Sequence, residues 1–126
     1  MSSRPVVVSH TGVFGACASA RNFPDELMRE IAAAGGLIAI GFWDKAVCDI
    51  SPAGVAAAIS YAVELLGEDH VALGSDFDGG TRTSFDSSEL AALTQALLDA
   101  GMSETAIRKV MGDNSVNFLQ RWLPRD

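Results

Sequence analysis

Short runs of apolar residues alternate with longer amphipathic segments along the chain, and this alternation predicts three strand-and-helix units. The apolar runs occupy residues 6–9, 37–42 and 70–75. Because they are apolar at nearly every position, we expect them to be buried on both faces, like strands of a parallel sheet covered by helices. The pattern therefore predicts an α/β fold with a parallel sheet.

Residues with special backbone or capping preferences set the limits of the predicted helices. The helix after the second strand begins at Ser51-Pro52, a cap followed by proline at the first helical position, and ends at Gly67. The expected helices cover residues 24–34, 52–66, 87–98, 104–111 and 114–122, and residues 43–50 are expected to form a loop.

Three βα units are too few for a complete (β/α)8 barrel of the TIM type, which needs about 200 to 250 residues. We interpret residues 1–126 as a single domain that forms the C-terminal segment of such a barrel. The three strands should then be parallel and in sequential order, with the helices on one face. A third strand between the other two would instead indicate a self-standing doubly wound sheet.

Composition excludes several classes of partner. The formal charge of −7 argues against nucleic acid and against anionic membrane surfaces, which both require a basic patch. No apolar run approaches the ~20 residues that span a bilayer, and the first residues lack the apolar core of a signal peptide. We expect a cytoplasmic protein, although a leader would be missing if the chain is a fragment.

Polar residues with chemical potential follow the first and third strands. His10 ends the first strand, and Asp76 and Asp78 follow the third in a glycine-rich segment. The carboxyl ends of parallel strands carry the active sites of α/β folds, so this pairing indicates a hydrolytic or metal site. A structural histidine would fit the pattern equally well, and Asp78, which precedes two glycines, is typical of a turn. Asp76 is the better catalytic candidate.

Four motifs in the chain resemble, in order and spacing, those of the membrane (renal) dipeptidase family, zinc metallopeptidase family M19. They lie at residues 5–10, 17–22, 74–79 and 112–114, and the resemblance extends from residue 5 to residue 122. It implies a (β/α)8 enzyme with two zinc ions that hydrolyses dipeptides.

The resemblance also implies roles for three residues. His10 would bind one of the two zinc ions, Arg21 would hold the free carboxylate of the substrate, and Asp76 would handle the proton during hydrolysis. Each role suits the chemistry of its side chain: imidazole is a good zinc ligand, guanidinium pairs with carboxylate, and a carboxylate can act as acid or base.

The other metal ligands of the family precede this segment, and the chain has no His-x-Asp pair. His70 opens its strand, so it should lie at the opposite end of the sheet from the metals. We therefore expect no tight zinc binding and no dipeptidase activity from the chain alone. Uncovered sheet edges should also make it a homo-oligomer.

The two cysteines lie in the predicted loops after the first and second strands. Neighbouring loops of a barrel could bring the Cα atoms of Cys17 and Cys48 within the ~4.4 to 6.8 Å that a disulfide requires. We expect the sulfurs to be close, bonded if the protein is exported and reduced if it is cytosolic.

Two other functions remain as alternatives. The chain could be an inactive, self-associating piece of a dipeptidase. The Asp-Phe-Asp-Gly stretch at residues 76–79 also fits the first motif of haloacid-dehalogenase-type phosphatases, but too short a segment follows it for the rest of such a domain. A dinucleotide-binding fold is excluded because no Gly-x-Gly-x-x-Gly follows any predicted strand.

Overall fold

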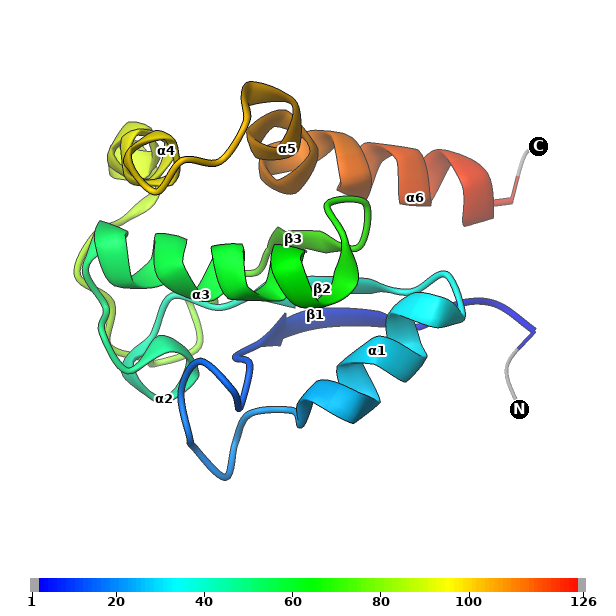
Figure 1. Cartoon of the computed structure of the whole chain (residues 1–126), viewed down its shortest axis with the longest axis horizontal. Coiled ribbons are helices and arrows are strands. Elements are labelled where there is room, and N and C mark those ends of the chain that lie inside the picture. Colours follow the sequence, from blue (N-terminus) through cyan, green and yellow to red (C-terminus); the bar gives the residue numbers. More distant parts are fainter. Residues whose placement is uncertain (1–2, 125–126) are drawn as a thin grey trace.

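The computed structural model describes residues 3–124, which fold around a three-stranded parallel sheet (Figure 1). The strands are β1 (Val7–Thr11), β2 (Leu37–Ile40) and β3 (Val71–Leu73), arranged in the order β1-β2-β3. Both neighbouring pairs are parallel, so the predicted parallel, sequential arrangement is confirmed. The doubly wound alternative, with the third strand in the centre, is excluded.

Helices and turns occupy most of the remaining chain. They are α1 (Asp25–Ala33), α2 (Asp44–Val47), α3 (Pro52–Leu66), α4 (Leu90–Asp99), α5 (Glu104–Arg108) and α6 (Asn114–Trp122), with a 3₁₀ turn η1 (Ser87–Glu89) and a π-helical turn η2 (Lys109–Asp113). The sequence did not predict α2, because a single helical turn is too short to show a periodicity. It also did not predict η2, which continues α5 directly into α6.

Hydroxyl and carboxylate side chains begin several of these elements, and the sequence predicted the first of them, Ser51. The Ser51 hydroxyl accepts a hydrogen bond from the Gly54 amide at 3.1 Å at the start of α3. Asp86 forms a reciprocal capping box with Glu89 at η1. Its carboxylate accepts hydrogen bonds from the Ser88 hydroxyl and amide, and these lower the Asp86 pKa.

The two faces of the sheet pack against different helices. On one face, Ile38, Ile40 and Val71 join a core that includes buried residues of α1, α3 and α4. On the other, Leu37, Ala39 and Ala72 form a smaller buried cluster with Phe118 of α6. The prediction that the helices cover one face is therefore wrong for α6, which reaches the second face because its Phe118 finds small alanine side chains there.

Asn114 attaches α6 to β3. Its side-chain amide donates hydrogen bonds to the carbonyls of Glu68 at 2.6 Å and Val71 at 2.9 Å, and the residue is 6% exposed. Asn114 does not cap α6, because Asp113 before it already has helical backbone angles. Beside it, ion pairs with Asp69 and Glu68 raise the Lys109 pKa.

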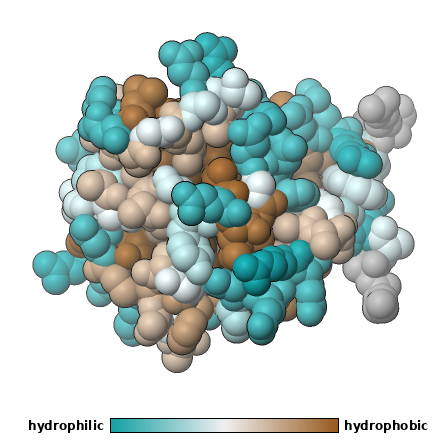
Figure 2. Space-filling model, in the orientation of Figure 1, coloured by the Kyte–Doolittle hydropathy of each residue, from teal (hydrophilic) through white to brown (hydrophobic). Residues whose placement is uncertain are grey.

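Some large apolar side chains of the described residues are exposed. Val6 and Val7 are 52% and 47% exposed at the first strand. Val116, Leu119 and Leu123 are also exposed on or just after α6. Figure 2 shows apolar and hydrophilic side chains interspersed on the face formed by α1 and α3. Within residues 3–124, no helix is long and apolar enough to cross a membrane.

Candidate active site

His10 lies at the carboxyl end of β1, inside an irregularity of the strand. Val8 pairs with Ile38 and Thr11 with Ile40, so β1 uses one more residue than β2 over this stretch. Such a bulge re-aims the side chains within it. The half-buried His10 ring places Nδ1 2.8 Å from the Ser9 hydroxyl, and among residues 3–124 its Nε2 has no hydrogen-bond partner.

Arg21 reaches back to His10 from the loop that follows β1. Its Nη2 donates to the His10 carbonyl at 3.5 Å, and its guanidinium carbon lies 5.4 Å from the centroid of the Trp43 ring. The Trp43 ring is also 5.8 Å from the His10 ring, in an edge-on arrangement. The structure therefore brings His10 and Arg21 together and adds Trp43, which was not predicted.

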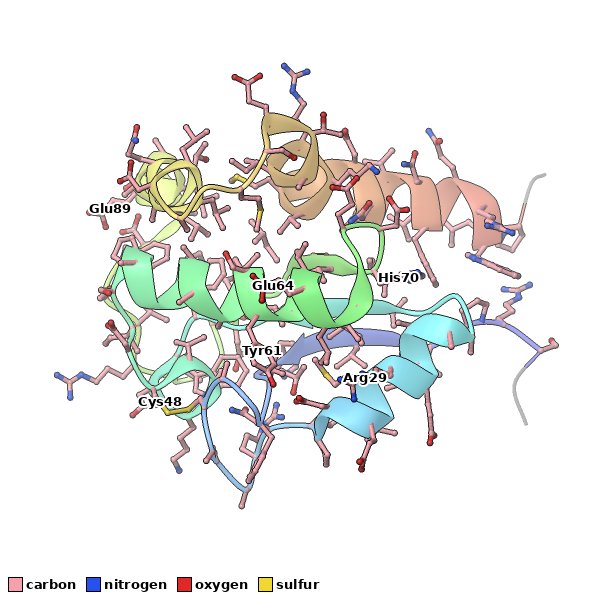
Figure 3. All side chains as sticks on the ribbon, viewed as in Figure 1. Arg29, Cys48, Tyr61, Glu64, His70 and Glu89 are labelled. Atoms are coloured by element: carbon pink, nitrogen blue, oxygen red, sulfur yellow. A yellow bond between two sulfur atoms is a disulfide. The ribbon has the colours of Figure 1, made fainter. Side chains whose placement is uncertain are left out.

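A buried asparagine and a disulfide join the two loops that carry Arg21 and Trp43. The Asn22 side-chain amide donates to the carbonyls of Cys17 and Ala46, each at 2.9 Å. Asn22 is 5% exposed. A disulfide links Cys17 to Cys48, with Cα atoms 5.6 Å apart, inside the range that the sequence-based prediction required. The labelled Cys48 is at the left of Figure 3.

Close packing around Gly12 supports the loop clamp, which consists of the Asn22 hydrogen bonds and the disulfide between Cys17 and Cys48. A side chain at residue 12 would overlap the Ala46 carbonyl and the Asn22 amide, with ideal Cβ distances of 2.0 and 2.5 Å. The motif at residues 17–22 had drawn attention to Arg21 but gave no role to Asn22. Burial of an amide whose donors face two loop carbonyls is a tertiary property that residue spacing does not reveal.

Asp76 lies just beyond β3 at the same end of the sheet. Its backbone φ of 58° is in the left-handed region, which aspartate tolerates better than most residues. Its carbonyl accepts hydrogen bonds from the Gly79 amide and the Thr81 hydroxyl, and its carboxylate lies against Gly79. In the described part of the chain this carboxylate forms no hydrogen bond or ion pair with His10 or Arg21.

Gly74 brings the end of β3 close to the end of β1 although β2 lies between them in the sheet. An ideal Cβ at residue 74 would be 2.3 Å from the Ser9 carbonyl oxygen and 3.1 Å from the His10 Cα. Only glycine allows this approach. The catalytic candidates of β1 and β3 therefore share one curved rim.

A tyrosine–aspartate pair supports the loop from the side of α3. The Tyr61 hydroxyl donates to the Asp25 carboxylate at 2.6 Å, and this hydrogen bond raises the Tyr61 pKa. Gly15 lies against the same hydroxyl, where a Cβ would be 2.0 Å from the oxygen. Figure 3 shows Tyr61 extending from α3 on the side of α1.

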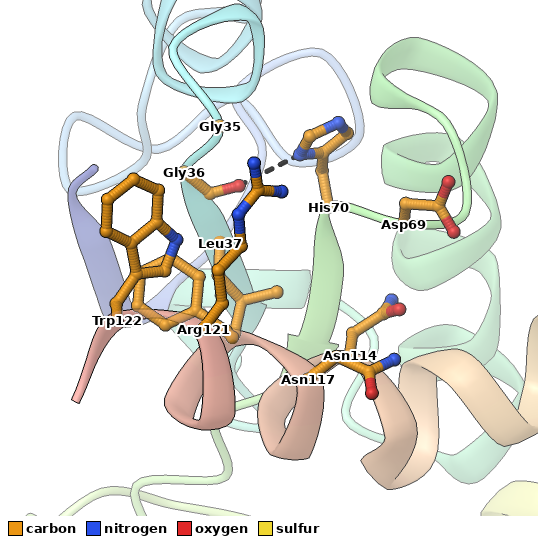
Figure 4. Close-up of a pocket in the computed structure, with 10 residues that line it drawn as sticks. Gly35, Gly36, Leu37, Asp69, His70, Asn114, Asn117, Arg121 and Trp122 are labelled. Carbon is orange, nitrogen blue, oxygen red and sulfur yellow. Dashed lines mark hydrogen bonds between the residues drawn. The ribbon is translucent and has the colours of Figure 1, made fainter. Parts of the chain in front are cut away.

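The rim lacks the side chains for a complete metal site within the described residues. Among residues 3–124, no group of three or more His, Cys, Asp or Glu side chains could hold a metal ion. His70 cannot contribute to this rim, because its Nδ1 hydrogen bonds to the Gly36 carbonyl at 3.0 Å at the amino end of the sheet. There it lines a cavity of about 360 Å³ with Arg121 and Trp122 (Figure 4).

The chain is similar to several known proteins over most of its length. Residues 1–122 match the membrane dipeptidase family (peptidase family M19). Dipeptidase aclJ of Aspergillus oryzae is 36% identical over 91% of this chain and 29% of its own length. A Rhodobacter sphaeroides metallo peptidase, solved with a phosphinate mimic of the dipeptide L-Ala-D-Ala, has a TM-score of 0.84 at 29% identity over 95% of this chain. An amidohydrolase from Pseudomonas aeruginosa has a TM-score of 0.82 at 29% identity over 94% of this chain.

The chain spans 37% of the Rhodobacter protein and 46% of the Pseudomonas protein, which is less than half of either. The match to the family nevertheless covers nearly the whole chain, and the four motifs noted in the sequence lie inside it. The candidate rim residues His10, Arg21 and Asp76 all belong to those motifs. The chain belongs to the membrane dipeptidase family, peptidase family M19.

Proposed function

We propose that this chain forms part of the active site of a zinc-dependent dipeptidase, as the C-terminal segment of a (β/α)8 barrel. The observation that supports this best is the meeting of His10 and Arg21 at the carboxyl end of the sheet, in a chain of a metallopeptidase family. A histidine at a barrel rim suits metal binding, and an arginine beside it suits a substrate with a free carboxylate.

Each of the three residues has a distinct role in this proposal. Arg21 binds the terminal carboxylate of the dipeptide through its planar fork of donors, which restricts the enzyme to short substrates. His10 offers Nε2 as a ligand while Nδ1 donates to the Ser9 hydroxyl, a hydrogen bond that would fix the orientation of the ring. Asp76 accepts and returns the proton during peptide hydrolysis.

The residues of this chain do not by themselves fit a zinc site. A catalytic zinc normally has three protein ligands and a water molecule, whereas this rim offers one imidazole and one nearby carboxylate. We therefore expect the purified 126-residue chain to bind zinc weakly and to leave dipeptides intact. Calorimetric zinc titration and an L-Ala-D-Ala hydrolysis assay measure the two properties.

A hybrid enzyme tests the proposal directly. In it, this chain replaces the matching segment of the Rhodobacter sphaeroides metallo peptidase, whose crystals contained a mimic of L-Ala-D-Ala. The hybrid should hydrolyse L-Ala-D-Ala, lose activity with a chelator and regain it with zinc. A folded hybrid that binds zinc but leaves the dipeptide intact would contradict the proposal.

Three substitutions in the hybrid separate the roles. His10→Ala should weaken zinc binding, and Arg21→Lys should raise KM because lysine cannot pair with both carboxylate oxygens. Asp76→Asn should lower kcat by about 10²- to 10⁴-fold while zinc stays bound. Asparagine is the suitable replacement because it tolerates the left-handed backbone of residue 76, whereas alanine would add strain. Full turnover in Asp76→Asn would exclude a catalytic role.

The isolated chain should also self-associate. The outer edge of β1 is flanked by the exposed Val6 and Val7, and an apolar stripe of α6 is uncovered. Unpaired edges and apolar patches favour association. Light scattering at micromolar concentration should therefore give a mass above that of a monomer, and Val7→Lys should lower it. A monomeric mass for the unmodified chain would contradict this expectation.

A further inference from the structure

We propose that Trp43 is a positioning residue of this site, whose indole ring holds the Arg21 guanidinium and the His10 ring in place. The inference rests on the proposed function, because it assigns these contacts to carboxylate recognition. Trp43 comes from the segment after β2, in which the sequence indicated no functional residue.

One aromatic ring contacts both site residues. The Arg21 guanidinium carbon is 5.4 Å from the ring centroid of Trp43, within the distance of a cation–π interaction. The His10 ring packs edge-on at 5.8 Å, with an angle of 61° between the ring planes. Since Trp43 is only 4% exposed, its ring is a buried support for the two side chains rather than a mobile surface group.

The position of the indole is itself fixed by its neighbours. The carbonyl of Trp43 accepts hydrogen bonds from the amides of Ala46 and Val47 at 2.9 and 3.1 Å, which begin α2. The ring lies directly over Gly41, where an ideal Cβ would be 1.9 Å from a ring carbon. Any larger residue at position 41 would displace the ring. Backbone and glycine together allow the indole little freedom.

The side chain of Arg21 depends on the Trp43 ring more than the backbone of its loop does. Apart from the ring contact, the side chain has one hydrogen bond within the described residues, a long one of 3.5 Å to the His10 carbonyl. The backbone of the loop is held separately by Asn22 and by the disulfide between Cys17 and Cys48. Loss of the indole should therefore release the guanidinium and leave the loop backbone in place.

A guanidinium held against a ring face is oriented before a carboxylate arrives, and this reduces the entropy lost on binding. Cation–π contacts at accessible positions correspond to about a two- to fivefold change in affinity. Trp43 should therefore affect dipeptides with a free carboxylate and have no comparable effect on dipeptide amides.

The experiment uses NMR spectroscopy of the 126-residue chain. The indole should shift the side-chain signals of Arg21 and the ring protons of His10. Trp43→Leu should remove both shifts, and Trp43→Phe should keep part of them. Trp122→Leu is the matched control, because Trp122 carries Arg121 at 5.5 Å but lies on α6. Gly41→Ala moves the ring without removing it and should also change both signals.

The functional arm titrates the same proteins with L-Ala-D-Ala and with its amide. The Arg21 side-chain signal should respond to the acid alone, with a Kd about two- to fivefold higher in Trp43→Leu than in the unmodified chain. Unchanged Arg21 and His10 signals in folded Trp43→Leu and Gly41→Ala would overturn the positioning role. A missing response to the acid in every variant would instead count against Arg21 as the carboxylate site, and hence against the proposed function.

Discussion

At the carboxyl end of the sheet Arg21 lies over Trp43, and at the amino end Arg121 lies over Trp122, with guanidinium-to-ring distances of 5.4 and 5.5 Å. The two pairs have nearly the same geometry but different sequence relations. Arg121 and Trp122 are adjacent on one helix, whereas Arg21 and Trp43 come from separate loops. Only the pair of Arg21 and Trp43 joins parts of the chain that folding must bring together.

A buried asparagine accompanies each pair. Asn22 and Asn114 both donate two hydrogen bonds from the side-chain amide to backbone carbonyls. Asn114 attaches a helix to a strand, and Asn22 attaches one rim loop to another. A buried asparagine amide thus stabilises the packing of a helix at one end of the sheet and the arrangement of two loops at the other. An arginine close to an aromatic ring is therefore a weak sign of a functional site unless contacts between distant segments hold the two residues together.

Removal of the disulfide should give the largest effect and should act mainly on the carboxyl end. The bond closes a sequence separation of 31 residues, which in the chain-entropy model corresponds to about 3 to 4 kcal/mol. Urea unfolding of the double variant Cys17→Ser/Cys48→Ser measures this loss. NMR signals around Arg21 should broaden, while those of Trp122 should stay unchanged. Equal changes in the signals of Arg21 and Trp122 would contradict the idea that the two ends of the sheet are stabilised separately.

The same bond also gives a test of location. Disulfides persist in oxidising compartments and are rare in the cytosol. Thiol counting after rapid acid quenching of cells that produce the protein should find the pair reduced if our expectation of a cytoplasmic protein is correct. A fully bonded pair in such cells would indicate export.

The two asparagines should differ in stability effect although they donate equal numbers of hydrogen bonds. Asn114→Ala should lower the free energy of unfolding by about 2 to 3 kcal/mol, because two carbonyls lose their donors in a buried place. Asn22→Ala should lower it by about 1 to 2 kcal/mol, since the buried side-chain oxygen of Asn22 has no hydrogen-bond partner in the part of the chain that the structure describes. A larger loss for Asn22 would show that the loop clamp contributes more than its hydrogen bonds.

Alkaline pH should give the smallest effect on stability, through two titratable groups, Tyr61 and Lys109. Hydrogen bonds to Asp25 raise the Tyr61 pKa, and those to Asp69 and Glu68 raise the Lys109 pKa. Both groups are favoured in the protonated state by the fold, so their contribution is complete below their ordinary pKa values and is lost as pH rises through the raised ones. Urea midpoints should fall at alkaline pH, less steeply in Tyr61→Phe and in Lys109→Met. An unchanged slope in both variants would contradict these contacts.

The sequence predicted the sheet well because the signals for its strands lie in short stretches of neighbouring residues. Apolar runs and glycine, proline and serine positions located all three strands and the helix from Pro52 to Leu66. The third strand is shorter than predicted and ends at Leu73. Gly74 beyond it is needed where the chain passes close to Ser9 and His10. That approach depends on a segment more than sixty residues away, which no local pattern contains.

The candidate site was predicted less completely. His10, Arg21 and Asp76 came from a family resemblance, and the structure places all three at one end of the sheet. Trp43 was missed although its position three residues after the end of β2 puts it at the same rim. Its burial, its ring contacts and the overlying of Gly41 all depend on tertiary packing. A search for aromatic residues just after each predicted strand would have found it.

The π-helical turn at Lys109–Asp113 has a consequence for how this chain can change in evolution. A π turn holds one residue more than an α turn, so it resembles an absorbed insertion within a continuous helix. Removing one residue there would return the turn to α geometry and leave the direction of α6 unchanged. Asn114 would still face β3, and Phe118 would still face Ala39 and Ala72. Removing one residue between Asn114 and Phe118, inside α6, would instead rotate everything beyond it by about 100° around the helix axis. A one-residue deletion should therefore be better tolerated in the π turn than in α6.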